Sequence, residues 1–171
     1  QLEKKLGANP YKFGMIGSTD SHTDLSTTAE DNFYGKHSAG MEPGPNRVKG
    51  IVGKAGDKVV YSWEQAASGY TAVWSTENTR EGIWDAMNRK EVYATTGSRI
   101  SLRFFGGWAF TSADAVKTNL AQVGYKKGVP MGGDLARAPE NTTISFLIAA
   151  TRDPMGANLD RIQVVKGWVD K

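Results

Sequence analysis

The sequence contains no cysteine in its 171 residues and only two histidines. The absence of cysteine excludes a disulfide framework, a thiolate-bound metal and a cysteine nucleophile. It does not select a compartment, because a chain without cysteine suits the cytoplasm and an oxidising space alike. The scarcity of histidine excludes a metal centre that draws several histidines from this chain alone.

Long apolar runs and dense clusters of one charge are missing as well. No stretch approaches the roughly 18 apolar residues of a membrane-spanning helix, so we expect no membrane partner. Lys and Arg number 21 against 18 Asp and Glu, and the net charge of +3 is spread along the chain. Proteins that bind nucleic acids concentrate their basic residues in a patch, so we expect no nucleic-acid partner.

The residues that are present are typical of a globular protein, with 39% hydrophobic and 23% charged side chains. Strand and helix signals alternate up to residue 97. Strands are predicted at Phe13–Gly17, 59–61 and 71–74, and a helix is predicted at 80–91. The first strand has apolar residues on both faces, as in a buried parallel sheet. Residues 18–57 show little periodicity and are predicted to form a long functional loop.

The predicted helix has both a start signal and an apolar stripe. Asn78 is a plausible N-cap, and Glu81 follows it at the spacing of a capping box. Ile83, Trp84 and Met87 recur at helical spacing, so we expect them to face the core.

The pattern changes near residue 98. Apolar residues then alternate with others in three segments, 100–105, 144–149 and 162–164. Such period-two runs, separated by Gly, Pro and Asn, predict a small antiparallel sheet or sandwich. The expected fold is therefore α/β over residues 1–97, followed by a β-rich module over 98–171.

The sharpest chemical signal is the pair Asp20 and His22, directly after the first predicted strand. In an extended chain, side chains two residues apart lie on the same side, so oxygen and nitrogen donors would converge. This donor pair suits a divalent ion of intermediate hardness. The alternative is a turn in which Asp20 bonds to its own backbone and His22 is merely polar.

Four other residues are weaker candidates. His37 lies in the long loop and is a candidate catalytic acid or ligand, although loop histidines are often simply solvated. Lys36 beside it, and Glu77 and Arg80 near the helix start, are candidates for substrate binding. Helix capping explains the segment around Glu77 without any chemistry. Several aromatic residues could stack on carbohydrate or fill the core, namely Phe104, Phe105, Trp108, Phe110 and Trp168.

The segment Phe13–His22 resembles the final metal-binding motif of the PHP (polymerase and histidinol phosphatase) superfamily. Four later blocks are similar to the bacterial domain-of-unknown-function family 3604, which is related to PHP metallohydrolases: residues 74–81, 93–100, 103–108 and 159–168. The resemblance implies the end of a PHP-like (β/α) barrel followed by a β-rich module. It also implies phosphoester hydrolysis by hydroxide on Zn, Mn or Fe, with Asp20 and His22 as ligands and His37 as an active-site neighbour.

PHP enzymes supply their other ligands from upstream His-x-His, Glu and His motifs, and these motifs do not occur in this sequence. The leading hypothesis is therefore a C-terminal fragment of a bacterial hydrolase, cytoplasmic or periplasmic, that is inactive alone. One alternative is a non-catalytic binding or assembly module that binds carbohydrate through Trp108 or Trp168. Another is a homo-oligomer in which copies cover each other's unpaired strands.

Overall fold

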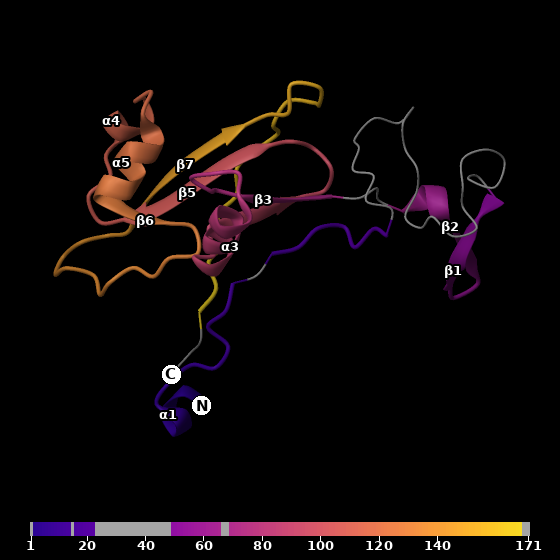
Figure 1. Cartoon of the computed structure of the whole chain (residues 1–171), viewed down its shortest axis with the longest axis horizontal. Coiled ribbons are helices and arrows are strands. Elements are labelled where there is room, and N and C mark those ends of the chain that lie inside the picture. Colours follow the sequence, from indigo (N-terminus) through magenta and orange to yellow (C-terminus); the bar gives the residue numbers. More distant parts are fainter. Residues whose placement is uncertain (1, 15, 23–48, 66–68, 169–171) are drawn as a thin grey trace.

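The computed structural model describes residues 2–14, 16–22, 49–65 and 69–168 (Figure 1). In chain order the elements are α1 (Leu2–Leu6), β1 (Ile51–Ala55), β2 (Lys58–Tyr61), the 3-10 turn η2 (Ser62–Glu64), β3 (Tyr70–Val73), α3 (Arg80–Asn88), β4 (Val92–Thr95), β5 (Ser101–Gly107), α4 (Ser112–Ala115), α5 (Leu120–Lys127), β6 (Gly128–Pro130) and β7 (Ser145–Thr151). Within these residues the strands form three antiparallel sheets, β1–β2, β3–β4 and β6–β5–β7.

The antiparallel β-rich architecture is confirmed, and the described residues contain no closed barrel. The predicted strand Phe13–Gly17 is wrong, because its described residues have no strand structure and Phe13 is 65% exposed. A parallel strand is stable only between neighbours that pair with its backbone, and no described strand pairs with this segment. The predicted loop 18–57 is also too long, because β1 begins at Ile51.

The predicted strand at 162–164 is wrong for a similar reason. Residues 157–168 have no secondary structure, and Ile162 and Val164 are 55% and 50% exposed. Their apolar alternation is real, but no described strand pairs with them. A period-two pattern therefore shows that a segment can form a strand and leaves its partner undetermined.

Helix α3 connects the two antiparallel strands β3 and β4. Its N-cap is Thr79 and not Asn78, because the Gly82 N–H donates to Thr79 Oγ1 at 3.1 Å. The helix ends at Asn88, and Lys90 then adopts a left-handed conformation (φ 63°) that turns the chain into β4.

Of the apolar stripe predicted for this helix, only Ile83 is partly buried. Trp84 is 66% and Met87 46% exposed, whereas Ala86 is fully buried. Ala86 is therefore the buried residue of α3.

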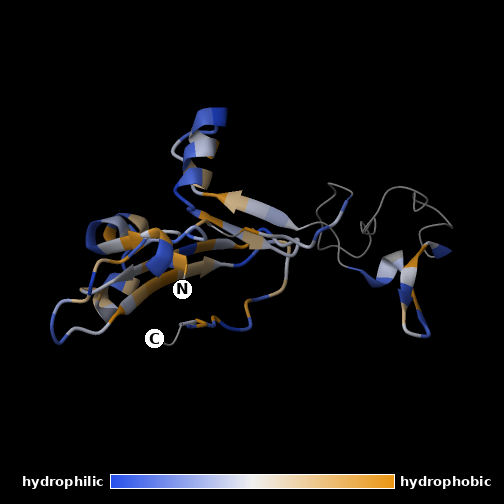
Figure 2. Ribbon diagram, turned by 90° about the horizontal axis from the view of Figure 1, so that it is seen from below, coloured by the Kyte–Doolittle hydropathy of each residue, from blue (hydrophilic) through white to orange (hydrophobic). Residues whose placement is uncertain are grey.

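Strand β5 is the centre of the three-stranded sheet, and Figure 1 shows α5 beside it. Residues 101–107 of β5 pair with residues 151–145 of β7, which places Phe105 opposite Leu147. These two residues and Val123 of α5 form the hydrophobic core, with Phe110 and Leu120 packed at its border. The ribbon in Figure 2 shows the apolar colouring along these central strands.

Asp114 of α4 and Asp153, which follows β7, are buried carboxylates beside the β6–β5–β7 sheet. Asp114 is 1% exposed and accepts hydrogen bonds from Lys127 Nζ at 2.7 Å and from the Thr111 N–H at 2.8 Å. The Lys127 ammonium and the Thr111 N–H hold the pKa of Asp114 well below its usual range. Asp153 accepts from the N–H groups of Arg99 and Met155, and these two bonds lower its pKa as well.

Candidate pocket beside the Asp20–His22 segment

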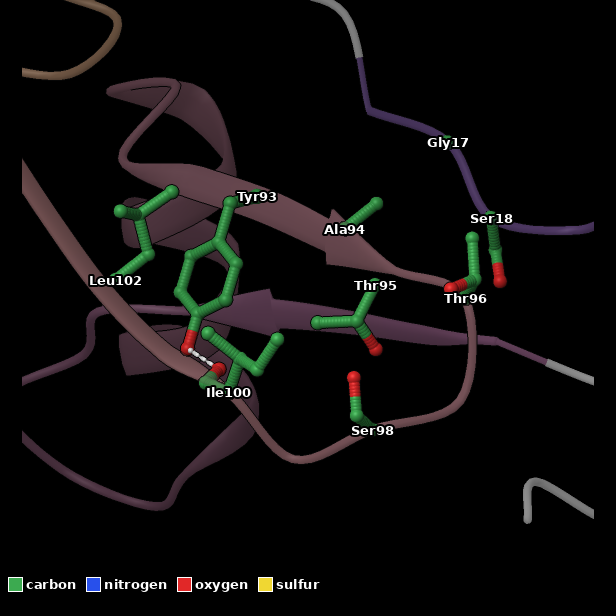
Figure 3. A pocket seen from close by; sticks show the side chains of 9 residues that line it. All are labelled: Gly17, Ser18, Tyr93, Ala94, Thr95, Thr96, Ser98, Ile100 and Leu102. Atoms are coloured by element: carbon green, nitrogen blue, oxygen red, sulfur yellow. Dashed lines mark hydrogen bonds between the residues drawn. The ribbon is translucent and has the colours of Figure 1, made fainter. Parts of the chain in front are cut away.

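A pocket of about 400 Å³ lies between the chain entering Asp20 and the end of β4 (Figure 3). Its lining comes from two stretches that are distant in the sequence. The lining residues are Gly17, Ser18, Tyr93, Ala94, Thr95, Thr96, Ser98, Ile100 and Leu102. We call this space the hydroxyl pocket, because five of these side chains carry a hydroxyl group.

Gly69, directly before β3, brings the two stretches together. Its N–H donates to Thr19 Oγ1 at 3.0 Å. A Cβ atom at Gly69 would overlap with Ser18 Oγ and with the Thr95 carbonyl oxygen, so a larger residue does not fit between them. Residues 17–19 therefore pass closely over the start of β3 and the end of β4, where Tyr70 and Thr95 are register partners.

The wall formed by residues 93–102 is held by its own hydrogen bonds. The Tyr93 hydroxyl donates to the Ile100 carbonyl at 2.9 Å, and the Gly97 N–H donates to Thr95 Oγ1 at 3.3 Å. The Arg99 N–H donates to the buried Asp153 carboxylate at 2.7 Å. These contacts fix the loop between β4 and β5, which forms one wall of the pocket.

Asp20 and His22 follow the pocket lining directly along the chain, and both are exposed. Asp20 has a left-handed backbone (φ 58°), a conformation that Asp tolerates better than most residues. The segment is therefore not the regular extended chain expected from the spacing, and alternation alone does not set the relative direction of the two side chains.

The chemistry of these two donors fits a divalent metal, but their number does not complete a site. A carboxylate oxygen and an imidazole nitrogen are common ligands of Zn²⁺ and of similar ions. Within the described part of the chain, no group of three or more His, Asp or Glu side chains could hold an ion. Further ligands would have to come from elsewhere.

The other predicted site residues are not brought to this pocket by the described structure. Lys36 and His37 lie outside the described residues. Glu77 and Arg80 are exposed and follow the opposite end of β3, where Val73 pairs with Val92. Arg80 lines a second hollow along α3, which shares no lining residue with the hydroxyl pocket.

Sequence reasoning missed a polar cluster around one buried carboxylate. We call it the Glu91 cluster, and it comprises Trp74, Arg89, Glu91, Arg103 and Tyr125. The Glu91 side chain is 4% exposed and pairs with Arg103 Nη1 at 3.1 Å and with Arg89 Nη2 at 3.5 Å. The Tyr125 hydroxyl donates to the same carboxylate, and the Arg103 guanidinium lies 3.3 Å from the centre of the Trp74 ring. Burial, and then the neighbouring Glu91 carboxylate, raise the pKa of Tyr125.

The two tryptophans of the carbohydrate-binding alternative are placed differently. Trp168 is 73% exposed, and Lys166 Nζ lies 5.9 Å from the centre of its ring. Trp108 directly follows β5 and is partly buried. Sugar binding through these two residues stays a prediction, as does pairing between copies of the chain.

Among the helices of the described residues, none is long and apolar enough to cross a membrane. No curated protein and no solved structure matches the chain. A family model does match, and it covers residues 1–171 under the description of a protein of unknown function (DUF3604). The chain therefore belongs to the DUF3604 family.

Proposed function

We propose that this chain is the C-terminal part of a PHP-like metal-dependent hydrolase of the phosphoesterase type, with Asp20 and His22 as two of its metal ligands. The observation that carries the proposal is that this donor pair begins two residues after the pocket-lining residue Ser18. A metal centre beside a pocket is the arrangement that a metallohydrolase requires.

The residues of this chain have simple roles in that arrangement. The Asp20 carboxylate and one ring nitrogen of neutral His22 would hold the ion, which requires His22 to be deprotonated. When bound there, a divalent metal would supply Lewis-acid chemistry, lowering the pKa of water and polarising the phosphoester. The hydroxyl pocket would bind the part of the substrate that does not react.

Metal binding tests the assignment of the two ligands. We expect the chain to bind Zn²⁺ or Mn²⁺ in equilibrium dialysis, and Asp20→Asn or His22→Gln to weaken binding by at least about tenfold. Loss of a supporting group around a metal already costs about 10–100-fold, so loss of a ligand should cost no less. Asp85→Asn is the control, because it removes the same charge from an exposed position on α3. Equal affinity of all four proteins would contradict the assignment.

Turnover tests the fragment part of the proposal. Two histidines and no upstream ligand motifs leave the centre incomplete. We therefore expect the isolated chain with Mn²⁺ or Zn²⁺ to hydrolyse bis(4-nitrophenyl) phosphate little faster than the metal alone. Rapid turnover that is abolished by EDTA and by His22→Gln would show a complete site and overturn this part.

A further inference from the structure

We propose that the hydroxyl pocket binds a neutral ring that carries several hydroxyl groups, such as a sugar or a cyclitol. This ring would be the alcohol part of the substrate, a role that rests on the proposed hydrolase function. The binding itself depends only on the residues that line the pocket.

The lining of the hydroxyl pocket carries no charge. None of the nine lining residues is charged at neutral pH. Arg99 and Arg103 each adjoin a lining residue along the chain, and neither lines the pocket. The Arg99 guanidinium is directed to Tyr70, with Nη2 3.4 Å from the hydroxyl oxygen and Cζ 5.6 Å from the ring centre. The Arg103 guanidinium pairs with Glu91 and lies over the Trp74 ring. Phosphate sites rely on Arg, Lys or converging backbone N–H groups. The pocket therefore favours a neutral group over a phosphate.

The lining can form hydrogen bonds in both directions, as donor and as acceptor. Hydroxyl groups of Ser18, Thr95, Thr96 and Ser98 come from both sides of the pocket, and Figure 3 shows the side chains of Thr95 and Ser98 directed toward one another. A serine or threonine hydroxyl both donates and accepts, and it rotates to suit its partner. The hydroxyl groups of a sugar have the same dual character, so several matched hydrogen bonds can form without any charge.

Part of the lining is apolar. The Tyr93 ring, Ile100 and Leu102 form one wall, and the hydrogen bond from Tyr93 to the Ile100 carbonyl fixes the ring. Sugar rings present C–H groups on one face, which pack against aromatic and aliphatic side chains while their hydroxyl groups bond at the edge. A volume of about 400 Å³ leaves room for one such ring.

The pocket lies close to the proposed metal ligands. Asp20 is two residues beyond Ser18, and two residues span at most about 7 Å even in a fully extended chain. A ring bound against Ser18 therefore lies within one substituent of the Asp20–His22 segment. This is the relation expected between the alcohol part of a phosphoester and the centre that cleaves it.

The test is a titration of small molecules into the 171-residue chain with EDTA present, in which NMR amide shifts report binding. Methyl glucoside, myo-inositol and inorganic phosphate are compared at equal ionic strength. We expect at least one of the two neutral compounds to shift the amides of residues 93–102, with a dissociation constant on the order of 1 mM, as for other small polar ligands. Phosphate should leave these amides unchanged.

The double variant Thr96→Val/Ser98→Ala removes two hydroxyl groups and little volume. We expect it to weaken binding by at least about fivefold, since each neutral hydrogen bond contributes modestly. Thr71→Val is the matched control, because Thr71 is an exposed residue of the same strand pair that does not line the pocket. Binding of phosphate at these residues, no shift with either neutral compound, or equal weakening by Thr71→Val would each overturn the proposal. Since EDTA removes the metal, this result is independent of the Asp20 and His22 variants, and the two proposals can fail separately.

Discussion

Replacing Arg103 by alanine is expected to lower the free energy of unfolding by about 3–5 kcal/mol, the usual cost of removing one partner from a buried ion pair. The Arg103 side chain is 20% exposed, and that of its partner Glu91 is 4% exposed. Without the guanidinium, the Glu91 carboxylate keeps Arg89 at 3.5 Å and the Tyr125 hydroxyl, but it loses its closest positive charge.

The substitution also removes a packing contact. The Arg103 guanidinium lies 3.3 Å from the centre of the Trp74 ring, and the Trp74 Nε1–H donates to the Leu102 carbonyl at 2.9 Å. A desolvated contact between a cation and an aromatic ring contributes about 2 kcal/mol. These losses overlap and are not added, but they act in the same direction.

The measurement is urea unfolding followed by tryptophan fluorescence. Arg161→Ala is the control, because Arg161 pairs with the exposed Asp160, and such surface pairs contribute about 0–1 kcal/mol. The double variant Glu91→Leu/Arg103→Leu should be less destabilised than Arg103→Ala, since neither charge is then left alone. If Arg103→Ala and Arg161→Ala had equal effects, the cluster would not stabilise the fold.

The Glu91 cluster also shows that a period-two pattern predicts a strand but not which of its faces is covered. The alternation near 100–105 and 144–149 predicted β5 and β7 correctly. It did not show which face of β5 is covered. The face that packs on α5 carries Phe105 and Arg103, which are two residues apart and both contact Tyr125. Leu102 and Phe104 alternate with them along the strand and are partly buried, as Arg103 is. Side chains two residues apart in a strand lie on the same face, so the position of Phe105 in the core implies that Arg103 lies on that face as well. A buried guanidinium requires an acidic partner, and Glu91 is that partner.

Only one part of the candidate site could be predicted from the sequence. The Asp20–His22 pair is visible because two chemically informative residues lie close together in the sequence. The hydroxyl pocket is not visible in the sequence, because serine and threonine are common and because its two walls meet through Gly69 and Thr19, which lie 50 residues apart. Local sequence patterns do not predict such a long-range contact. That Gly69 must lack a side chain is evident only from the fold, where Ser18 and Thr95 leave no room for a Cβ atom.

Replacing Phe105 by alanine is the second large expected effect, again about 3–5 kcal/mol. Phe105 is fully buried and contacts Tyr125 edge-on, with 5.2 Å between the ring centres. The core that it shares with Val123 and Leu147 is small, so the neighbours have little freedom to close the cavity. In urea unfolding, the midpoint of Phe105→Ala should be lower than that of the unchanged chain.

A substitution at Gly124 of α5 tests whether close packing around the Phe105 ring determines the free energy of unfolding. A Cβ atom at Gly124 would lie 2.5 Å from Phe105 Cδ2. Alanine gains about 1 kcal/mol over glycine in a helix, but overpacking a core costs about 1–3 kcal/mol, so Gly124→Ala should be destabilising. Gly53→Ala in β1 is the control, because a Cβ atom there has no neighbour within 4 Å.

In the double variant Phe105→Ala/Gly124→Ala, the new methyl group occupies part of the space that the ring leaves. Its loss of stability should therefore be smaller than the sum of the two single losses, by an amount in the range of about 0.5–3 kcal/mol that is typical of residues in contact. Strict additivity would mean that the ring moves away from α5 in the Gly124→Ala protein. The close packing of α5 on β5 would then not be what holds this small core together.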